Sequence, residues 1–141
     1  MDRHATAVWK GTLKEGAGTL DTQSSALKSI PYSFKGRFED ESGKSGTNPE
    51  ELLAAAHAGC FAMQLSHFLA ENGTPAEKLD AKAVVTLVPG TGITGSAITL
   101  VGTVPGISAE KFKELADKAK AECPVSRALG AIKVSLNAKL G

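Results

Sequence analysis

Short runs of β-branched and aromatic side chains, separated by glycine-rich turns, fill the first forty residues, which is typical of strands. Residues 5–13 form one run, and residues 19–22 form a second after the turn Gly16-Ala17-Gly18. These two runs predict an N-terminal hairpin. Aromatic positions then alternate between Pro31 and Phe38, which predicts a third extended segment with Arg37 at or near its end.

A long apolar stretch with clear start and stop signals follows a predicted loop over residues 39–47. Asn48 suits the N-cap position, Pro49 the first helical position, and Asn72-Gly73 the end of a helix. The residues between these signals are apolar or small on every side. This pattern predicts a helix that is buried all round and places Cys60 deep inside the protein.

Alternation returns at residues 78–88 and 97–104, which flank a glycine turn and predict a second hairpin. Ser108 is the expected N-cap of an amphipathic helix that runs to about residue 121, where Cys123-Pro124 interrupts it. A half-buried strand around residues 132–136 closes the chain. The order of elements predicts an α+β fold with antiparallel sheets packed on a central helix.

Composition narrows the possible functions. The 141 residues, 42% of which are hydrophobic, fit a single domain with its own core. Sixteen basic residues against fifteen acidic ones argue against a nucleic-acid or anionic-membrane partner. We find no signal peptide, and no window approaches the roughly 18 apolar residues that cross a bilayer. We therefore expect a cytoplasmic protein with a small, weakly charged partner.

The two cysteines are the strongest candidates for chemistry. In a reducing cytosol such a pair is inert, metal-bound or redox-active. Burial raises a thiol pKa, so a reactive Cys60 requires a cation, either Arg37 or His57, although a histidine on an apolar helix is more often a packed core residue. Cys123 precedes Pro124 at the start of a short helix, where backbone N–H groups favour a thiolate. The residues alone leave open which cysteine attacks.

Two rival uses of these motifs are disfavoured. Cys60, Cys123 and His57 make at most three metal ligands and lack the paired short spacings of zinc sites. The glycines at positions 90–95 open no helix and therefore predict a hairpin turn rather than a dinucleotide-binding loop. We expect neither a metal nor a bound cofactor.

Helix geometry bears on the oligomeric state. Glu50 or Glu51 can orient Arg37, or can simply offset the helix dipole. Ten residues separate Glu50 from Cys60, which corresponds to about 15 Å of helical rise, so the two cannot share one arginine within a single helix. If both engage Arg37, one of them belongs to a second chain. This predicts a homodimer with its site at the interface.

Residues 46–61, GTNPEELLAAAHAGCF, and residues 121–126, AECPVS, are the most distinctive segments of the chain. They resemble the motifs of the OsmC branch of the OsmC/Ohr hydroperoxide reductase family. Trp9-Lys10-Gly11, the segment from Pro31 to Phe38 and Val104-Pro105-Gly106 follow in the family's order, so the resemblance covers nearly the whole chain.

The resemblance implies an attacking Cys60, a resolving Cys123, a thiolate-stabilising Arg37 and its partner Glu50. It implies an intertwined homodimer in which antiparallel sheets wrap two central helices. The implied activity is thiol-dependent reduction of organic peroxides, and more weakly of hydrogen peroxide, in oxidative and osmotic stress defence.

The implied cycle passes through a Cys60 sulfenic acid and a Cys60–Cys123 disulfide. A dithiol such as a dihydrolipoyl group would reopen that disulfide. The alternative is a peroxide-sensing or binding protein that forms the same disulfide but turns over slowly.

Overall fold

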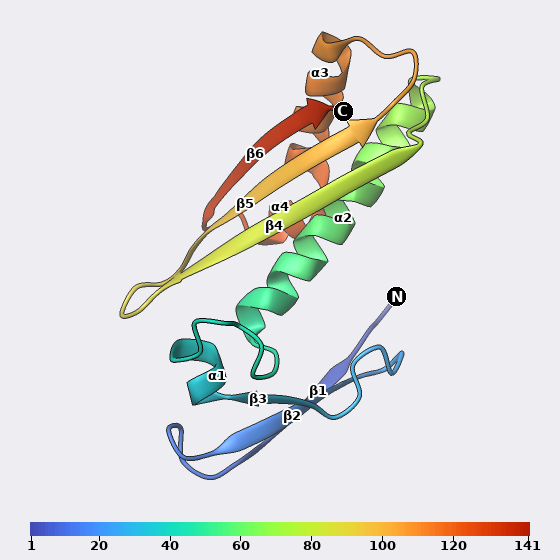
Figure 1. The fold of residues 1–141 in the computed structure, drawn as a ribbon. Coiled ribbons are helices and arrows are strands. Elements are labelled where there is room, and N and C mark those ends of the chain that lie inside the picture. The colour runs from blue at the N-terminus through green and yellow to red at the C-terminus, as the bar shows by residue number, and fades with distance from the viewer. The chain divides into compact units, whose positions relative to one another are not determined.

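The computed structural model describes residues 1–141 and divides into two compact units, Met1–Pro49 and Glu50–Gly141. Each unit contains its own three-stranded sheet (Figure 1). The two sheets together with the helices make an α+β fold, as predicted.

The N-terminal unit is built on an antiparallel sheet of order β1-β2-β3. Its strands are β1 (Ala5–Lys10), β2 (Ala17–Thr22) and β3 (Ile30–Ser33). The predicted N-terminal hairpin is therefore confirmed. Strand β1 stops at Lys10 because Gly11 takes a φ of 93°, which begins the turn.

A short helix, α1 (Phe34–Phe38), replaces the second half of the predicted third strand. The hydroxyl of Ser33 accepts a hydrogen bond from the backbone N–H of Gly36 and so caps the helix. Phe34 and Phe38, the two ends of α1, contact each other one turn apart, with tilted rings whose centroids are 4.8 Å from each other. Their spacing of four is helical, so the expected extended conformation is wrong here, and Arg37 lies on a helix.

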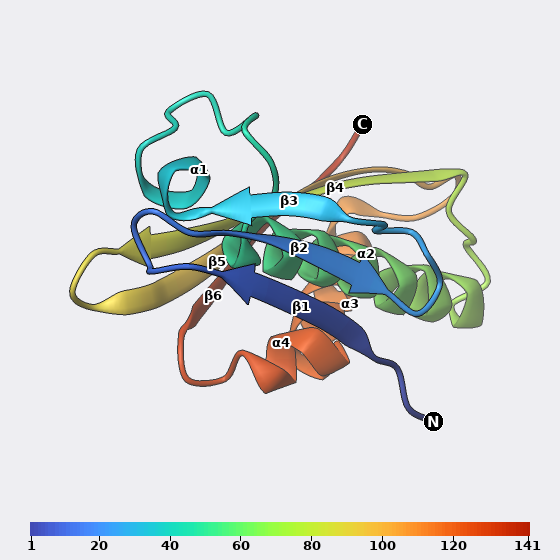
Figure 2. The same ribbon diagram turned by 90° about the horizontal axis from the view of Figure 1, so that it is seen from below.

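The C-terminal unit combines helices with the second sheet, of order β4-β5-β6. Helix α2 (Pro49–Glu71) has the limits that the start and stop signals predict, and Gly73 after it has a φ of 78°. In Figures 1 and 2 the helices lie on one side of the sheet. The remaining elements are β4 (Lys78–Val88), β5 (Gly92–Thr103), α3 (Ala109–Glu122), α4 (Pro124–Ala128) and β6 (Lys133–Leu140).

Strand pairing in this sheet is mixed. β4 and β5 form the predicted antiparallel hairpin, although β5 begins earlier than expected, at Gly92. β6 pairs with β5 in parallel, so the prediction of purely antiparallel sheets is wrong for this pair. Parallel neighbours require a long crossover connection, and α3 with α4 supplies it between β5 and β6.

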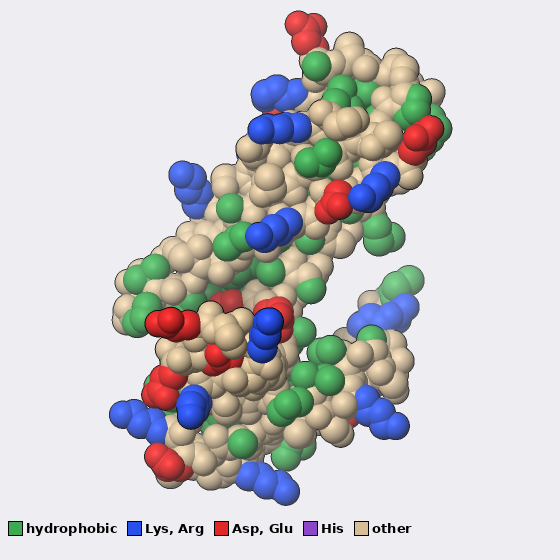
Figure 3. Space-filling model, in the orientation of Figure 1, with side chains coloured by type: hydrophobic (Ala, Val, Ile, Leu, Met, Phe, Trp, Pro, Cys, Tyr) green, Lys and Arg blue, Asp and Glu red, His purple; other side chains and the backbone are tan.

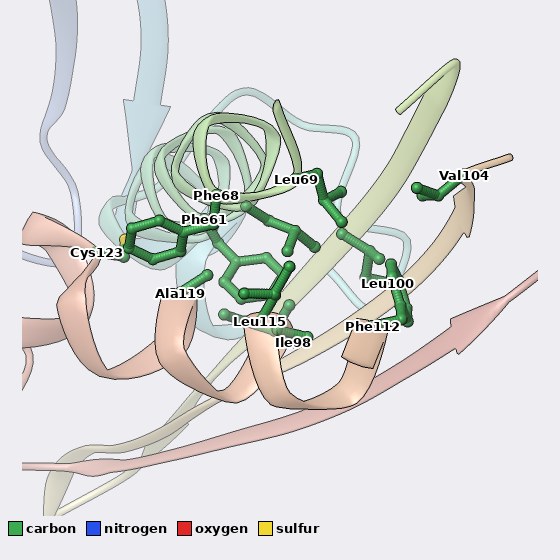
Figure 4. Packing of buried hydrophobic residues seen from close by; sticks show 12 residues of the cluster. Phe61, Phe68, Leu69, Ile98, Leu100, Val104, Phe112, Leu115, Ala119 and Cys123 are labelled. Carbon is green, nitrogen blue, oxygen red and sulfur yellow. The ribbon is translucent and has the colours of Figure 1, made fainter. Parts of the chain in front are cut away.

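The core of the C-terminal unit lies between α2, α3 and the inner face of the sheet (Figure 4). Apolar side chains from α2 meet alternate residues of β5 and one stripe of α3, as the periods of a helix and a strand require. The buried cluster consists of Phe61, Leu65, Phe68, Leu69, Ile98, Leu100, Val104, Phe112, Leu115, Ala116, Ala119 and Cys123.

Helix α2 buries only one side within the chain, so the prediction of a helix buried all round is wrong. Its core side carries Phe61 and Leu65, both fully buried. Its other side carries small residues and Met63, which is 77% exposed. α2 is apolar all round because both of its sides are apolar, although the core of the C-terminal unit covers only one of them.

The same helix corrects one further expectation. α2 has 23 residues, and its most apolar 18-residue stretch has a mean hydropathy of 1.3, so the helix is long and apolar enough to cross a membrane by length and composition. The core helices of globular proteins pass the same test, and one such helix is weak evidence for a membrane span.

The outer face of the second sheet carries charges of both signs among hydrophobic side chains (Figure 3). Along β4 the exposed positions include Lys78, Asp80, Lys82 and Val84. Lys78 pairs with Asp80 at 3.2 Å. This face therefore presents no extended field of one sign.

Candidate functional site

The two cysteines lie side by side in the C-terminal unit. Helix α2 carries Cys60, and the junction of α3 and α4 carries Cys123. Their sulfur atoms are 2.9 Å apart, which is a thiol–thiol contact, since a disulfide bond measures about 2.05 Å. Both cysteines are free thiols. The structure thus brings together the two candidates that are 63 residues apart in sequence.

The burial of the two thiols differs from the prediction. Cys60 is only half-buried, so the expectation that it lies deep inside the protein is wrong for this chain. Cys123 is fully buried, and Figure 4 shows it beside Phe61 at one end of the core. The difference follows from α2, which turns Cys60 toward the border of its uncovered side.

The environments of the two thiols shift their pKa values in opposite directions. Burial, reinforced by the Cys123 thiol, raises the pKa of Cys60. Burial also raises the pKa of Cys123, but interactions with the Cys60 thiol, with Ser126 and with the first backbone N–H groups of α4 outweigh it and lower that pKa overall. Within this unit the thiolate is therefore favoured on Cys123.

His57 is a neutral core residue. Its ring is fully buried, with Nδ1 2.7 Å from the hydroxyl of Ser96 and Nε2 2.7 Å from the hydroxyl of Ser126. Burial lowers the pKa of His57, so the ring carries no charge at neutral pH. His57 is thus not the cation that Cys60 requires, and its interpretation as a packed core residue is confirmed.

The two serines around His57 escaped the sequence analysis, although a signal for one of them exists. Ser96 shares the buried phase of β5 with Ile98 and Leu100, so its hydroxyl has to face the core and find a partner there. Ser126 gives a weaker signal, as the third residue of a short helix that begins with Pro124-Val125.

Arg37 and Glu50 stand on different elements. Arg37 is exposed on α1 in the N-terminal unit, with its guanidinium 5.0 Å from the centre of the Phe38 ring. Glu50 is half-buried in the first turn of α2, the helix that also carries Cys60. Glu50 and Cys60 are therefore separated by about 15 Å of helical rise along α2, and the roles of Arg37 and Glu50 remain predictions.

The surroundings of Arg37 form an aromatic hollow within the N-terminal unit. Its cavity volume is about 270 Å³, and Trp9, Tyr32, Phe34 and Phe38 line it together with Arg37. Trp9 and Tyr32 contact each other across the sheet, with ring centroids 5.2 Å apart. An arginine at the edge of an apolar hollow can hold a polar group while the hollow accommodates an apolar one.

No group of three or more His, Cys, Asp or Glu side chains is arranged to hold a metal ion. The chemistry available to the thiol pair is thiolate formation, oxidation and disulfide exchange.

Comparison with known proteins gives consistent matches. The family model described as OsmC-like protein matches residues 41–137. The chain is 45% identical to peroxiredoxin OsmC of Escherichia coli (strain K12) over 134 residues, which cover 93% of this chain and 92% of that protein. It is 34% identical to an organic hydroperoxide resistance protein of Xanthomonas axonopodis pv. citri (strain 306), over 94% of this chain and 90% of that protein.

A comparison with solved structures finds the same fold in a related protein. The crystal structure of the organic hydroperoxide resistance protein OhrB of Bacillus subtilis matches with a TM-score of 0.67 and 25% sequence identity, and the match covers 96% of this chain and 97% of that one.

Proposed function

Because the chain belongs to the family of OsmC-like proteins, we propose that it is a thiol-dependent peroxidase that reduces organic hydroperoxides and, more weakly, hydrogen peroxide. The names of its relatives, peroxiredoxin and organic hydroperoxide resistance protein, support a peroxide-detoxifying redox role. The observation that carries the proposal is the 2.9 Å contact between the sulfur atoms of Cys60 and Cys123. Two thiols at this separation can pass between dithiol and disulfide with little movement of the backbone.

The proposed reaction has three steps. The Cys60 thiolate attacks one peroxide oxygen, the O–O bond breaks, and the alkoxide leaves and takes up a proton to form an alcohol. The resulting Cys60 sulfenic acid is attacked by the Cys123 thiolate, which expels hydroxide as water and forms the disulfide. An external dithiol, such as a protein-bound dihydrolipoyl group, then reduces the disulfide by exchange and is itself oxidised.

The first step requires a cation beside Cys60, because burial raises the pKa of this thiol. Arg37 is our candidate, oriented by Glu50. Because about 15 Å of helix separates Glu50 from Cys60, both can engage one arginine only if a second chain supplies one of them. The uncovered apolar side of α2 around Met63 supports the same conclusion, namely a homodimer with its site at the interface.

The cellular setting follows from the chemistry. A cycle that ends in reduction by a dithiol suits a reducing compartment, so we place the protein in the cytoplasm. Its role there would be defence against oxidative and osmotic stress.

The test of the reaction is the consumption of tert-butyl hydroperoxide and hydrogen peroxide by purified protein with a dithiol reductant. The wild type should turn over and prefer the organic peroxide. Cys60→Ser should be inactive, and Cys123→Ser should accumulate oxidised Cys60 that mass spectrometry detects. If the wild type forms the disulfide but turns over only slowly, the protein is a sensor or binding protein instead.

The test of the shared site is complementation between two inactive variants. Glu50→Ala and Cys60→Ser should each abolish activity in a dimer of one kind of subunit. Mixed and reassembled, they should regain activity, because one of the two sites then combines a native Cys60 with a native Glu50 from the other chain. Two variants that stay inactive together, or a fully active monomer in light scattering, would rule out the shared site.

A further inference from the structure

We propose that Ser126 and His57 are positioning residues for Cys123: the neutral imidazole holds the Ser126 hydroxyl so that its O–H donates a hydrogen bond to the Cys123 sulfur. This inference rests on the proposed function, in which Cys123 resolves the Cys60 sulfenic acid. It gives His57 a role beyond core packing, although both ring nitrogens form their hydrogen bonds with serine hydroxyls and not with a thiol.

The start of α4 brings Ser126 close to Cys123. Cys123 is the N-cap of this helix and Ser126 is its third residue. The third position of a helix lies close to the N-cap residue, as the capping box illustrates, so the short side chain of Ser126 is held near Cys123. Ser126 is only 7% exposed, so little water competes for its hydroxyl.

His57 fixes the direction of that hydroxyl. Its Nε2 lies 2.7 Å from the Ser126 oxygen, and its Nδ1 lies 2.7 Å from the oxygen of Ser96 on β5. A neutral imidazole has one N–H donor and one acceptor nitrogen. If Nδ1 accepts from Ser96, Nε2–H donates to Ser126, and the Ser126 hydrogen is left to point at the sulfur.

The opposite tautomer would break this arrangement, because Nε2 would then accept the Ser126 hydrogen and turn it away from the sulfur. The hydrogen bond from Ser126 is one of the contacts that lower the pKa of Cys123, which agrees with the first arrangement. Three elements, α2, β5 and α4, therefore contribute one directed chain of hydrogen bonds that ends at Cys123.

The chain stabilises the thiolate without taking its proton. Cys123 gives up its proton to solvent, and its sulfur attacks the sulfenic sulfur of Cys60. The S–O bond breaks, the S–S bond forms, and the departing hydroxide takes up a proton to become water. Ser126 and His57 keep their protons throughout.

The test uses the Cys60→Ser protein, in which Cys123 is the only thiol and no peroxidase activity is needed. The measurement is the rate at which iodoacetamide alkylates Cys123 as a function of pH. Ser126→Ala should lower that rate about tenfold near neutral pH and shift the profile to higher pH, since one hydrogen bond to a charged group is worth about 1.5 kcal/mol. Ser126→Thr, which restores a hydroxyl, should restore the rate.

Two matched replacements of His57 refine the test. Gln places an amide near the position of Nε2 and can still donate to Ser126, whereas Asn reaches only toward Ser96. His57→Gln should therefore retain most of the Cys123 reactivity, and His57→Asn should lose it. The charged neighbours in sequence, Glu122 and Arg127, are exposed and unchanged in every variant.

A profile that Ser126→Ala leaves unchanged, in a protein whose circular dichroism is that of the wild type, would overturn the inference. The outcome is separate from that of the proposed function. If the Ser126 effect appears but the native protein reduces no peroxide, the positioning of Cys123 stands and the peroxidase proposal fails.

Discussion

Acidification should destabilise the protein through His57, because the folded structure holds this ring neutral. The pKa of His57 lies below its ordinary value of 6.5 owing to burial. Between the folded and the unfolded pKa, the unfolded chain binds one more proton than the folded one, so the free energy of unfolding rises with pH in this window. The stabilisation is complete above about pH 6.5 and is lost as the pH falls below it.

The size of the effect follows from the linkage relation. One extra proton on the unfolded chain corresponds to a slope of about 1.4 kcal/mol per pH unit. Between about pH 7.5 and 5.5 a single histidine with an unfolded pKa near 6.5 can therefore remove up to about 1.4 kcal/mol of the free energy of unfolding. That amount is a noticeable part of the roughly 5–15 kcal/mol typical of a domain.

Urea unfolding, followed by circular dichroism at a series of pH values, measures this slope. His57→Gln is the matched control, because it keeps an amide near the position of Nε2 but does not titrate. Its lower but flatter profile, subtracted from that of the wild type, should leave a curve that falls below about pH 6.5. If the two profiles run parallel from pH 7.5 to 5.5, His57 is not held neutral by the fold and the argument is refuted.

Three substitutions test the packing and the capping in the C-terminal unit, each by urea unfolding. Phe61→Ala empties a fully buried position and should cost about 3–5 kcal/mol. Gly102→Ala should cost about 1–3 kcal/mol, because its new methyl group would stand 2.9 Å from the Phe112 ring, and a Phe112→Leu background should relieve part of that cost. Ser108→Ala removes the side chain that accepts from the Lys111 N–H and should cost about 1 kcal/mol, whereas Ser108→Asp should not.

Local signals predicted the elements whose ends they mark. The limits of α2 and α3 follow from Asn48-Pro49, Asn72-Gly73 and Ser108, and β4 occupies the residues that its alternation indicates. These signals act within a few residues, so they do not depend on the contacts that the rest of the chain makes. The short helix α1 was missed because two aromatic residues four apart fit both a strand and a helix in so short a segment.

Strand direction and burial depend on distant parts of the chain, and they were predicted less well. Nothing in the alternation of β6 reveals whether it runs parallel or antiparallel to β5, since both pairings present the same face to the core. The uncovered side of α2 illustrates the second difficulty. An apolar side of a helix predicts that some surface covers it, but it does not reveal whether that surface belongs to the same chain or to another.

The pair of thiols shows how fold and chemistry depend on each other. Cys123 needs nothing beyond its own unit to favour a thiolate, since the start of α4, Ser126 and the neighbouring thiol act on it together. Cys60 lacks such help within that unit, where burial raises its pKa. If Cys60 is the attacking sulfur and Cys123 the resolving one, as we propose, this difference would confine peroxide reduction to a site in which a cation lies beside Cys60. The partly exposed Cys60 would otherwise be open to oxidation in every unassembled chain.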